Sequence, residues 1–507
     1  MSEHAGAGTA PVPSGLGDGR VLDTDPEPTS LRRAGATGVM WQGLAYVFGK
    51  LVVAATTVAL ARMIAPEQFG LVALATVLIT FSNVVSDGGV AQALVYLETT
   101  RETTRSAMLV ALTTGGLMAG AVAVLAPALA RFFDNPEVAD LTRVLSLVLL
   151  LGSLASVPEA LLRRKLLYRR LAWSSVLRAV VIGVTSIGLA VAGWEAWAIV
   201  WGTVAGALTY TVAMWWMMPA GVDLRLWRVR RRDLGAVVRY GLPAALGILL
   251  SRLIFDVDYL IVGRQLGAEA LGFYTVAFRL PELAIVNVFF VISSVTFPLY
   301  SRARADPERL RSGYCTSVRI QSVYGVSAGV GLAIIAPVAV PTLFGDRWLP
   351  AVECLAALGL YAALRSVGAG ANDVYKAIGR PSITVWVSLL RLAVLLPALI
   401  LAADHGIAGV AWTQAALAGC FAVLMQGVAT RVIGLRPGRF VRAIAPAFAC
   451  GCAVAVTVSA VVYGMPGSDP TKMWVGILVG ALTVVGVVRL CAPEMVVEVR
   501  STVRRKR

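Results

Sequence analysis

Long apolar stretches recur along the whole chain and restrict its possible folds more than any other feature. Each holds about 20 residues with few charges, enough for one helix to cross a hydrocarbon core about 30 Å thick. Because lipid offers the backbone no hydrogen-bond partners, such segments must be helical. A soluble chain of 507 residues would have roughly a quarter of them charged, whereas 15% are charged here and 58% are hydrophobic. The sequence therefore predicts an all-α polytopic membrane protein.

Fourteen stretches have the length of a transmembrane helix. They lie at about 38–60, 69–95, 107–130, 139–160, 173–192, 195–217, 238–262, 271–298, 316–344, 351–372, 382–402, 407–430, 440–463 and 473–491. Clusters of arginine and lysine occupy every second loop between them. Such loops stay in the cytoplasm. We therefore expect a multi-pass protein of the cell (inner or plasma) membrane with both termini cytoplasmic.

Part of the sequence near the N-terminus reappears 202 positions later. The charged and glycine residues of the first copy match those of the second without a gap: Arg62, Glu67 and Gly70 pair with Arg264, Glu269 and Gly272. At the same offset Lys50 falls on Arg252, so each copy places one cation inside an apolar helix. Agreement of charged residues and glycine over one constant offset indicates an internal duplication.

The duplication predicts two six-helix bundles of the same topology around a central cleft, the usual place for a transporter's substrate. Two extra C-terminal helices follow. We expect these segments: a disordered cytoplasmic tail 1–36, a first bundle 37–218, a basic cytoplasmic linker 219–237, a second bundle 238–432, helices 13 and 14 in 433–492, and a basic cytoplasmic tail 493–507. The tail lacks the apolar block of a signal peptide.

Charged residues inside the spans are the candidate functional groups, because a charge at bilayer depth costs about a few kcal/mol unless it is paired or hydrated. We assign five cations to a substrate-binding cleft: Lys50, Arg252, Arg279, Arg365 and Arg391. We assign four acidic residues to ion coupling or charge pairing: Asp87, Asp256, Asp258 and Glu282. Since arginine holds phosphate-like groups with a bidentate fork, the cleft suits an anionic ligand.

Two interpretations of these charges stay open. In the first they form local ion pairs, because Arg252 and Asp256 are four residues apart, and Arg279 and Glu282 are three apart. In the second, the cations without such neighbours meet the ligand: Lys50, Arg391 and also Arg365. Asp258 either binds a coupling proton or sodium ion or lies at the membrane interface.

The sequence gives little support for a metal site, nucleic-acid binding or enzymatic activity. The chain has two histidines and six cysteines without metal-ligand spacing, so we expect no metal and no cofactor. The net charge of +16 follows from the basic loops, which argues against nucleic acid as a partner. A membrane enzyme would need a sizeable loop with carboxylates or a metal site, and the longest loop is short and basic. Trp194 and Trp197 are interpreted as interface anchors.

Several motifs between about residues 34 and 435 carry a family resemblance. In chain order they are 62–70, 87–94, 157–165, 194–200, 258–274, 297–298, 343–348 and 377–381. Together they resemble the polysaccharide branch of the multidrug/oligosaccharidyl-lipid/polysaccharide (MOP) exporter superfamily. The likeness is greatest to exporters of lipopolysaccharide and exopolysaccharide.

The resemblance implies a flippase, not an enzyme, that moves polyprenyl-diphosphate-linked oligosaccharide from the cytoplasmic to the outer leaflet by alternating access, for cell-surface polysaccharide biosynthesis. Its partners would be this lipid-linked substrate, membrane lipids, a coupling proton or sodium ion, and glycan polymerase and glycosyltransferases. The alternative is a cation-coupled multidrug exporter of the same superfamily. The substrate cleft of a multidrug exporter would favour acidic residues, whereas cations are at least as prominent inside these spans.

Overall fold

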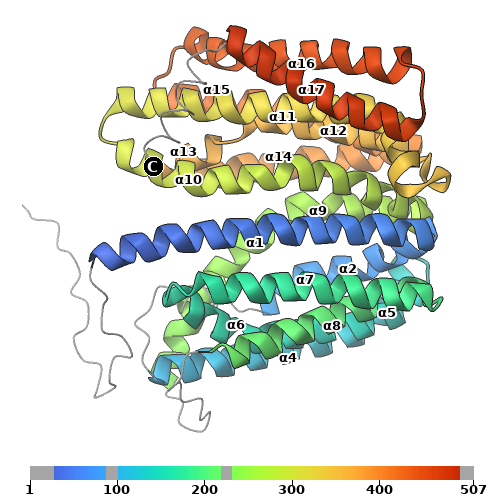
Figure 1. The fold of residues 1–507 in the computed structure, drawn as a ribbon. Helices are drawn as coiled ribbons and strands as arrows, with labels where there is room; N and C mark the ends of the chain where they lie inside the picture. Colours follow the sequence, from blue (N-terminus) through green and yellow to red (C-terminus); the bar gives the residue numbers. More distant parts are fainter. Residues whose placement is uncertain (1–27, 87–100, 219–230, 492–507) are drawn as a thin grey trace, which may run out of the picture.

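The computed structural model describes residues 28–86, 101–218 and 231–491, and every regular element in these segments is a helix (Figure 1). Eleven helical stretches in them are long and apolar enough to cross a membrane. The two longest of these each contain a break, Asp256–Ala303 at Gly267 and Ser382–Val432 at Ala403–His405. The predicted all-α polytopic membrane fold is confirmed, whereas the number of fourteen spans stays a prediction.

The first half of the protein extends from α1 to α8. Its helices are α1 (Pro28–Met63), α2 (Pro66–Ser86), α4 (Arg101–Phe132), α5 (Glu137–Leu145), α6 (Leu147–Arg164), α7 (Tyr168–Val191) and α8 (Glu195–Trp216). Helix α1 packs along α7, and α7 packs along α8 (Figure 1). Residues 28–36, predicted to belong to a disordered tail, are helical. Pro28 suits the first turn of a helix, and the leucine and arginines that follow favour continuing it.

The second half extends from α9 to α15. Its elements are α9 (Arg231–Pro281), the π-helical turn η2 (Glu282–Val286), α10 (Asn287–Ala303), α11 (Pro307–Phe344), η3 (Asp346–Trp348), α12 (Ala351–Gly368), α13 (Ala371–Ala377), α14 (Ser382–Ala402), η4 (Ala403–His405) and α15 (Gly406–Val432). Two predicted spans meet at Gly267 within α9. Its φ of 85° and ψ of −178° suit glycine alone. Helices α16 (Pro437–Gly464) and α17 (Asp469–Cys491) pack on α11.

The helix connections lie at two opposite ends of the molecule (Figure 1). One end carries the start of α1 and the connections after α6, α10 and α15; we call it the Pro28 end. The other carries the end of α1 and the connections after α4, α7 and α11; we call it the Met63 end. The basic loops that the sequence assigns to the cytoplasm, such as residues 163–170 and 302–311, lie at the Pro28 end.

The two halves meet at the Met63 end in a contact that repeats the offset of 202 residues. A methyl group added to Gly70 would lie 1.6 Å from the carbonyl oxygen of Ala268, and one added to Gly272 would lie 1.9 Å from that of Pro66. Pro66 and Ala268 are themselves 202 positions apart. The contact of Gly70 with Ala268 therefore has a symmetric counterpart in the contact of Gly272 with Pro66, as at a two-fold interface. The packing of the halves thus displays the predicted duplication.

A second pair of contacts follows the same pattern. Arg62 at the end of α1 donates its Nε–H to the carbonyl of Leu343 at 2.9 Å, and also bonds Thr342, near the end of α11. Its counterpart Arg264 places its guanidinium 5.6 Å from the centre of the Phe132 ring, at the end of α4. Each arginine thus reaches the third long helix of the opposite half.

Trp348 fills the space between these contacts. Its side chain is fully buried, and its indole N–H donates to the carbonyl of Ala61 at 2.8 Å. The rings of Phe69 and Phe273, one from each half, meet it edge to face with centroids 5.4 and 5.8 Å away. We call this set the end closure: Arg62, Phe69, Gly70, Gly272, Phe273 and Trp348. It joins the halves at the Met63 end.

Candidate functional site

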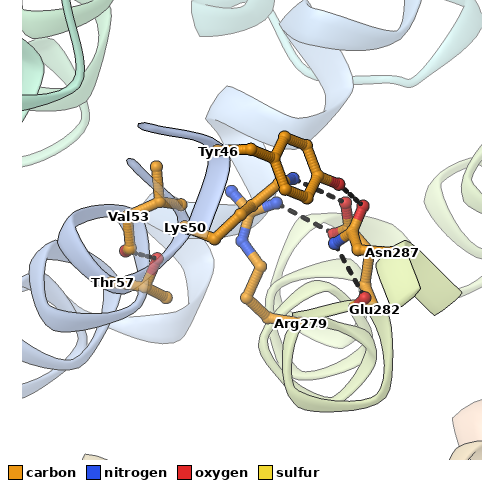
Figure 2. Close-up of polar contacts among 7 residues, drawn as sticks. All are labelled: Tyr46, Lys50, Val53, Thr57, Arg279, Glu282 and Asn287. Carbon is orange, nitrogen blue, oxygen red and sulfur yellow. Dashed lines mark hydrogen bonds and ion pairs between the residues drawn. The ribbon is translucent and has the colours of Figure 1, made fainter. Parts of the chain in front are cut away.

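A polar cluster joins the two halves farther from the Met63 end of α1 than the end closure (Figure 2). It consists of Tyr46 and Lys50 on α1 and of Arg279, Glu282 and Asn287 around η2, and we call it the seam cluster. The Lys50 Nζ lies 3.9 Å from Glu282 Oε1, and Arg279 Nη1 lies 3.1 Å from Glu282 Oε2. Tyr46 donates its hydroxyl to Asn287 Oδ1 at 2.7 Å. One carboxylate therefore holds a cation from each half.

Pro281 explains why the second half presents these side chains here. Proline has no N–H, so it cannot continue the hydrogen-bond ladder of α9. The π-helical turn η2 follows directly, and the Asn287 backbone N–H bonds the carbonyl of Glu282 five residues earlier. The Asn287 side-chain amide donates to the same carbonyl at 2.8 Å. Turns of this kind are frequent at functional sites, and this one aims Glu282 across the seam toward α1 (Figure 2).

The seam cluster keeps an excess of positive charge. Lys50 and Arg279 carry two positive charges against the single negative charge of Glu282. The three side chains remain between 29% and 38% exposed, so a ligand can reach them. The predicted pair of Arg279 with Glu282 is confirmed. The expectation that Lys50 has no counter-charge is wrong, because Glu282 is supplied by the opposite half.

A second group of cations lies within the second half. Arg365 on α12 donates from Nη1 to the hydroxyl of Tyr361 at 2.6 Å, with its guanidinium 5.8 Å from the ring centre. Arg391 on α14 is close enough to act electrostatically on both Tyr361 and Arg365. Among the residues that the structure describes, the buried Nε of Arg391 has no hydrogen-bond acceptor. We call Arg365 and Arg391 the arginine pair, because Arg391 acts electrostatically on Arg365; two guanidinium groups suit a multiply charged anion.

Aromatic rings connect the two cationic groups. Phe278 precedes Arg279 in sequence, and its ring centre lies 6.1 Å from that of Tyr361, which bonds Arg365. Tyr259 and Tyr274 pack against Phe278 on the other side, at 6.2 and 6.4 Å. Aromatic rings therefore link the part of the seam cluster that lies in the second half with Arg365.

Asp258 is buried inside the second half. Its side chain is 1% exposed. Its carboxylate accepts hydrogen bonds from the Tyr274 hydroxyl at 2.6 Å, the Gln414 side-chain amide at 3.1 Å and the Tyr259 backbone N–H at 3.1 Å. Uncharged donors alone neutralise a buried carboxylate poorly. The arrangement suits a group that gains and loses a proton or a small cation.

Other assigned residues fall outside this geometry. Asp87 and the side chain of Arg252 lie outside the described residues, and Asp256 is half-buried on α9, two residues from Asp258. Their assigned roles stay predictions. Asp373, which had no assigned role, is a buried carboxylate on α13 that accepts hydrogen bonds from Ser293 at 2.7 Å and from Thr296 at 3.0 Å.

The sequence offered no signal for several of these partners. Tyr46 and Asn287 are 241 positions apart, and Ser293 and Asp373 are 80 apart. Such pairs become neighbours only through helix packing. Tyr46 alone carried a local signal, because it lies four residues before Lys50 and therefore shares its helix face.

Comparisons with known proteins agree with this fold. The sequence pattern of the family described as polysaccharide biosynthesis protein matches residues 59–353. The lipopolysaccharide biosynthesis protein WzxC of Escherichia coli (strain K12) is 24% identical over 73% of this chain and 76% of its own length. The succinoglycan biosynthesis transport protein ExoT of Rhizobium meliloti (strain 1021) is 27% identical over 66% of this chain and 67% of its own.

A solved structure of the lipid II flippase MurJ, in an inward closed conformation, has the same fold. The TM-score is 0.70 at 13% identity, and the match covers 90% of this chain and 100% of that one. The resemblance to the polysaccharide branch of the MOP superfamily, stated from the motifs, is thereby confirmed. Since the family pattern covers more than half of its residues, the chain belongs to the polysaccharide biosynthesis protein family.

Proposed function

We propose that this protein is a flippase for polyprenyl-diphosphate-linked oligosaccharide, moving it from the cytoplasmic to the outer leaflet by alternating access. The observation that carries the proposal is the seam cluster, in which each half contributes one cation to a partly exposed site with excess positive charge. The relatives named for polysaccharide biosynthesis and transport, and the flippase that shares the fold, support the substrate class.

The cations would hold the diphosphate of the lipid carrier. Lys50 and Arg279 can each turn from Glu282 to a phosphate oxygen, because both remain partly exposed. Arg365 and Arg391 would take a second phosphate or the first sugar, since Arg391 acts electrostatically on Arg365. Two cationic groups joined by aromatic rings match a ligand that carries its charges beside a ring-shaped sugar.

Movement of the two halves would expose this site to each side of the membrane in turn. The end closure joins the halves at the Met63 end. By the positive-inside rule this end would be at the outer face of the cell membrane. The seam cluster shares one carboxylate between the halves, so a ligand that displaces Glu282 also weakens a link between them. Binding and rearrangement would then be coupled through differential contacts.

Asp258 is our candidate for coupling to a proton or sodium ion, with Asp256 and Asp87 as further carboxylates. Asp258 faces Tyr274 and Gln414 and lies beside the rings that reach Arg365. Occupation of Asp258 by a cation would therefore change the electrostatic field at the arginine pair. No nucleotide-driven step is part of this proposal.

The remaining features of the proposal follow from the sequence. The protein would lie in the cell membrane with both termini in the cytoplasm and without enzymatic activity. Bundles 37–218 and 238–432 would be the moving halves, linked by residues 219–237, with 433–492 appended. Glycan polymerase and glycosyltransferases would act before and after it.

A depletion experiment in cells tests the proposal. We expect lipid-linked glycan to accumulate on the cytoplasmic leaflet when the protein is depleted, and to be released when wild type is restored. Arg391→Ala should restore it poorly at equal membrane levels, while Arg442→Ala, an exposed arginine on α16, should restore it fully. Surface glycan that persists at normal levels after depletion would refute the proposal, and increased drug resistance on expression would favour a multidrug exporter.

A further inference from the structure

A polar cavity lies at the Met63 end of the first half, on the starts of α2, α5 and α8 and the turn after α7. Its volume is about 520 Å³, which is within the range of small-molecule sites. Two indole rings, three carboxylates and one amide line it: Trp194, Trp197, Glu137, Asp140, Glu195 and Gln68. None of these residues belongs to the seam cluster or to the arginine pair.

The lining has the chemistry of a sugar site. A pyranose ring presents a flat face of C–H groups and a rim of hydroxyls. Indole rings offer a large flat apolar surface for the first, while carboxylates and amides accept hydrogen bonds from the second. Trp194 is 49% exposed, so its ring is open to a ligand, and Trp197 is half-buried beside it.

Other occupants fit these residues less well. Nowhere among the described residues do three histidine, cysteine or acidic side chains come close enough to hold a metal ion, so the carboxylates do not form a cation site. Asp140 is already paired with Arg143 at 2.6 Å, which reduces the negative charge of the cavity. A role of Trp194 and Trp197 as interface anchors does not explain why three carboxylates line the same cavity.

The cavity adjoins the end closure. Gln68 lines it, and the next two residues, Phe69 and Gly70, pack against Trp348 and Ala268 of the other half. Glu195 adopts a positive φ of 44°, which is strained for a residue with a side chain and is held where it starts α8 beside the cavity. A ligand in the cavity would therefore touch the segment that closes the Met63 end.

We infer that this cavity binds a saccharide unit of the transported glycan at the side of the membrane where the Met63 end opens. The inference rests on the proposed function for the identity of the glycan. Stacking on Trp194 and hydrogen bonds to Glu195 and Glu137 hold the sugar. The lipid and its diphosphate are not needed for this contact, because the cavity lining contains no cation.

The test uses the full-length protein in nanodiscs and the water-soluble oligosaccharide released by mild acid from the cells' own lipid-linked intermediates. Titration calorimetry should detect binding to wild type. Trp194→Ala and Glu195→Gln should each weaken it about tenfold or more, and Trp194→Phe should retain most of it. Trp474→Ala, which removes an exposed indole at the same end outside the cavity, should bind like wild type.

Three results would overturn the inference. They are no binding to wild type, equal binding to wild type and Trp194→Ala, and heat from calcium chloride alone that Glu195→Gln removes. Transport of the lipid-linked glycan in vesicles is measured in parallel. Transport without oligosaccharide binding supports the proposed function and refutes the saccharide site. Binding without transport supports the saccharide site and refutes the proposed function.

Discussion

Alanine at Gly70 or Gly272 should open the end closure. The new methyl group would lie 1.6 Å from the Ala268 carbonyl oxygen in the first case and 1.9 Å from that of Pro66 in the second. Reaching 3.0 Å, below which real Cβ contacts are essentially never found, separates the backbones by about 1.4 and 1.1 Å. Overpacking of this kind costs about 1–3 kcal/mol. The ratio of closed to open molecules should therefore fall about 5- to 150-fold.

Distances between spin labels on Met63 and Leu349 measure this ratio. The two residues flank the closure on opposite halves and are 40% and 51% exposed, so labels fit without disturbing the core. In a protein whose native cysteines have been replaced, double electron–electron resonance should give a short distance for the closed state. Both alanine variants should add a population at longer distance.

Gly188→Ala on α7 is the matched control. Nothing lies within 4 Å of a methyl group at Gly188, so this variant should keep the distance distribution of the labelled parent. The methyl groups of Gly70→Ala and Gly272→Ala strain the same interface. The double variant should therefore change the free energy of closure by less than the sum of the two single effects. Equal distributions for Gly70→Ala, Gly272→Ala and Gly188→Ala would refute the closure.

Two further predictions concern the polar sites. Glu282→Gln removes the carboxylate that Lys50 and Arg279 share, so thermal unfolding in detergent should show a loss of about 1 kcal/mol. Inorganic pyrophosphate should then stabilise the variant more than wild type, and equal stabilisation of the two would contradict an anion site at the seam. Asp258→Asn keeps an acceptor for Tyr274 but removes the charge, so transport in vesicles should lose its dependence on an imposed proton or sodium gradient. An unchanged dependence would exclude Asp258 as the coupling group.

The helices and the duplication could be predicted because their signals are local or periodic. Apolar stretches of membrane length identify the spans, and the constant offset between Arg62 and Arg264 identifies the two copies. The π-helical turn after Pro281 has a local cause too, because proline has no backbone N–H to donate. The start of α1 at Pro28 was missed, because the polar composition of the tail concealed residues that favour a helix.

The partners of the charged residues could be predicted only where they share a helix. Arg279 and Glu282 lie three residues apart, and their pair was foreseen. The link from Lys50 to the same carboxylate depends on how α1 packs against η2, which no spacing in the sequence records. The cavity around Trp194 likewise gathers residues from 68 to 197, so its tryptophans were interpreted singly as anchors.

The most direct test of the account is flipping by the purified protein. Vesicles containing fluorescent polyprenyl-diphosphate oligosaccharide are treated with a membrane-impermeant oxidant that modifies only outward-facing sugars. We predict that wild type and Arg442→Ala speed the exchange between leaflets, and that Arg279→Ala loses about tenfold or more of this rate. Equal rates for protein-free and wild-type vesicles would contradict the flippase. A rate for Arg279→Ala equal to that of wild type would contradict its site.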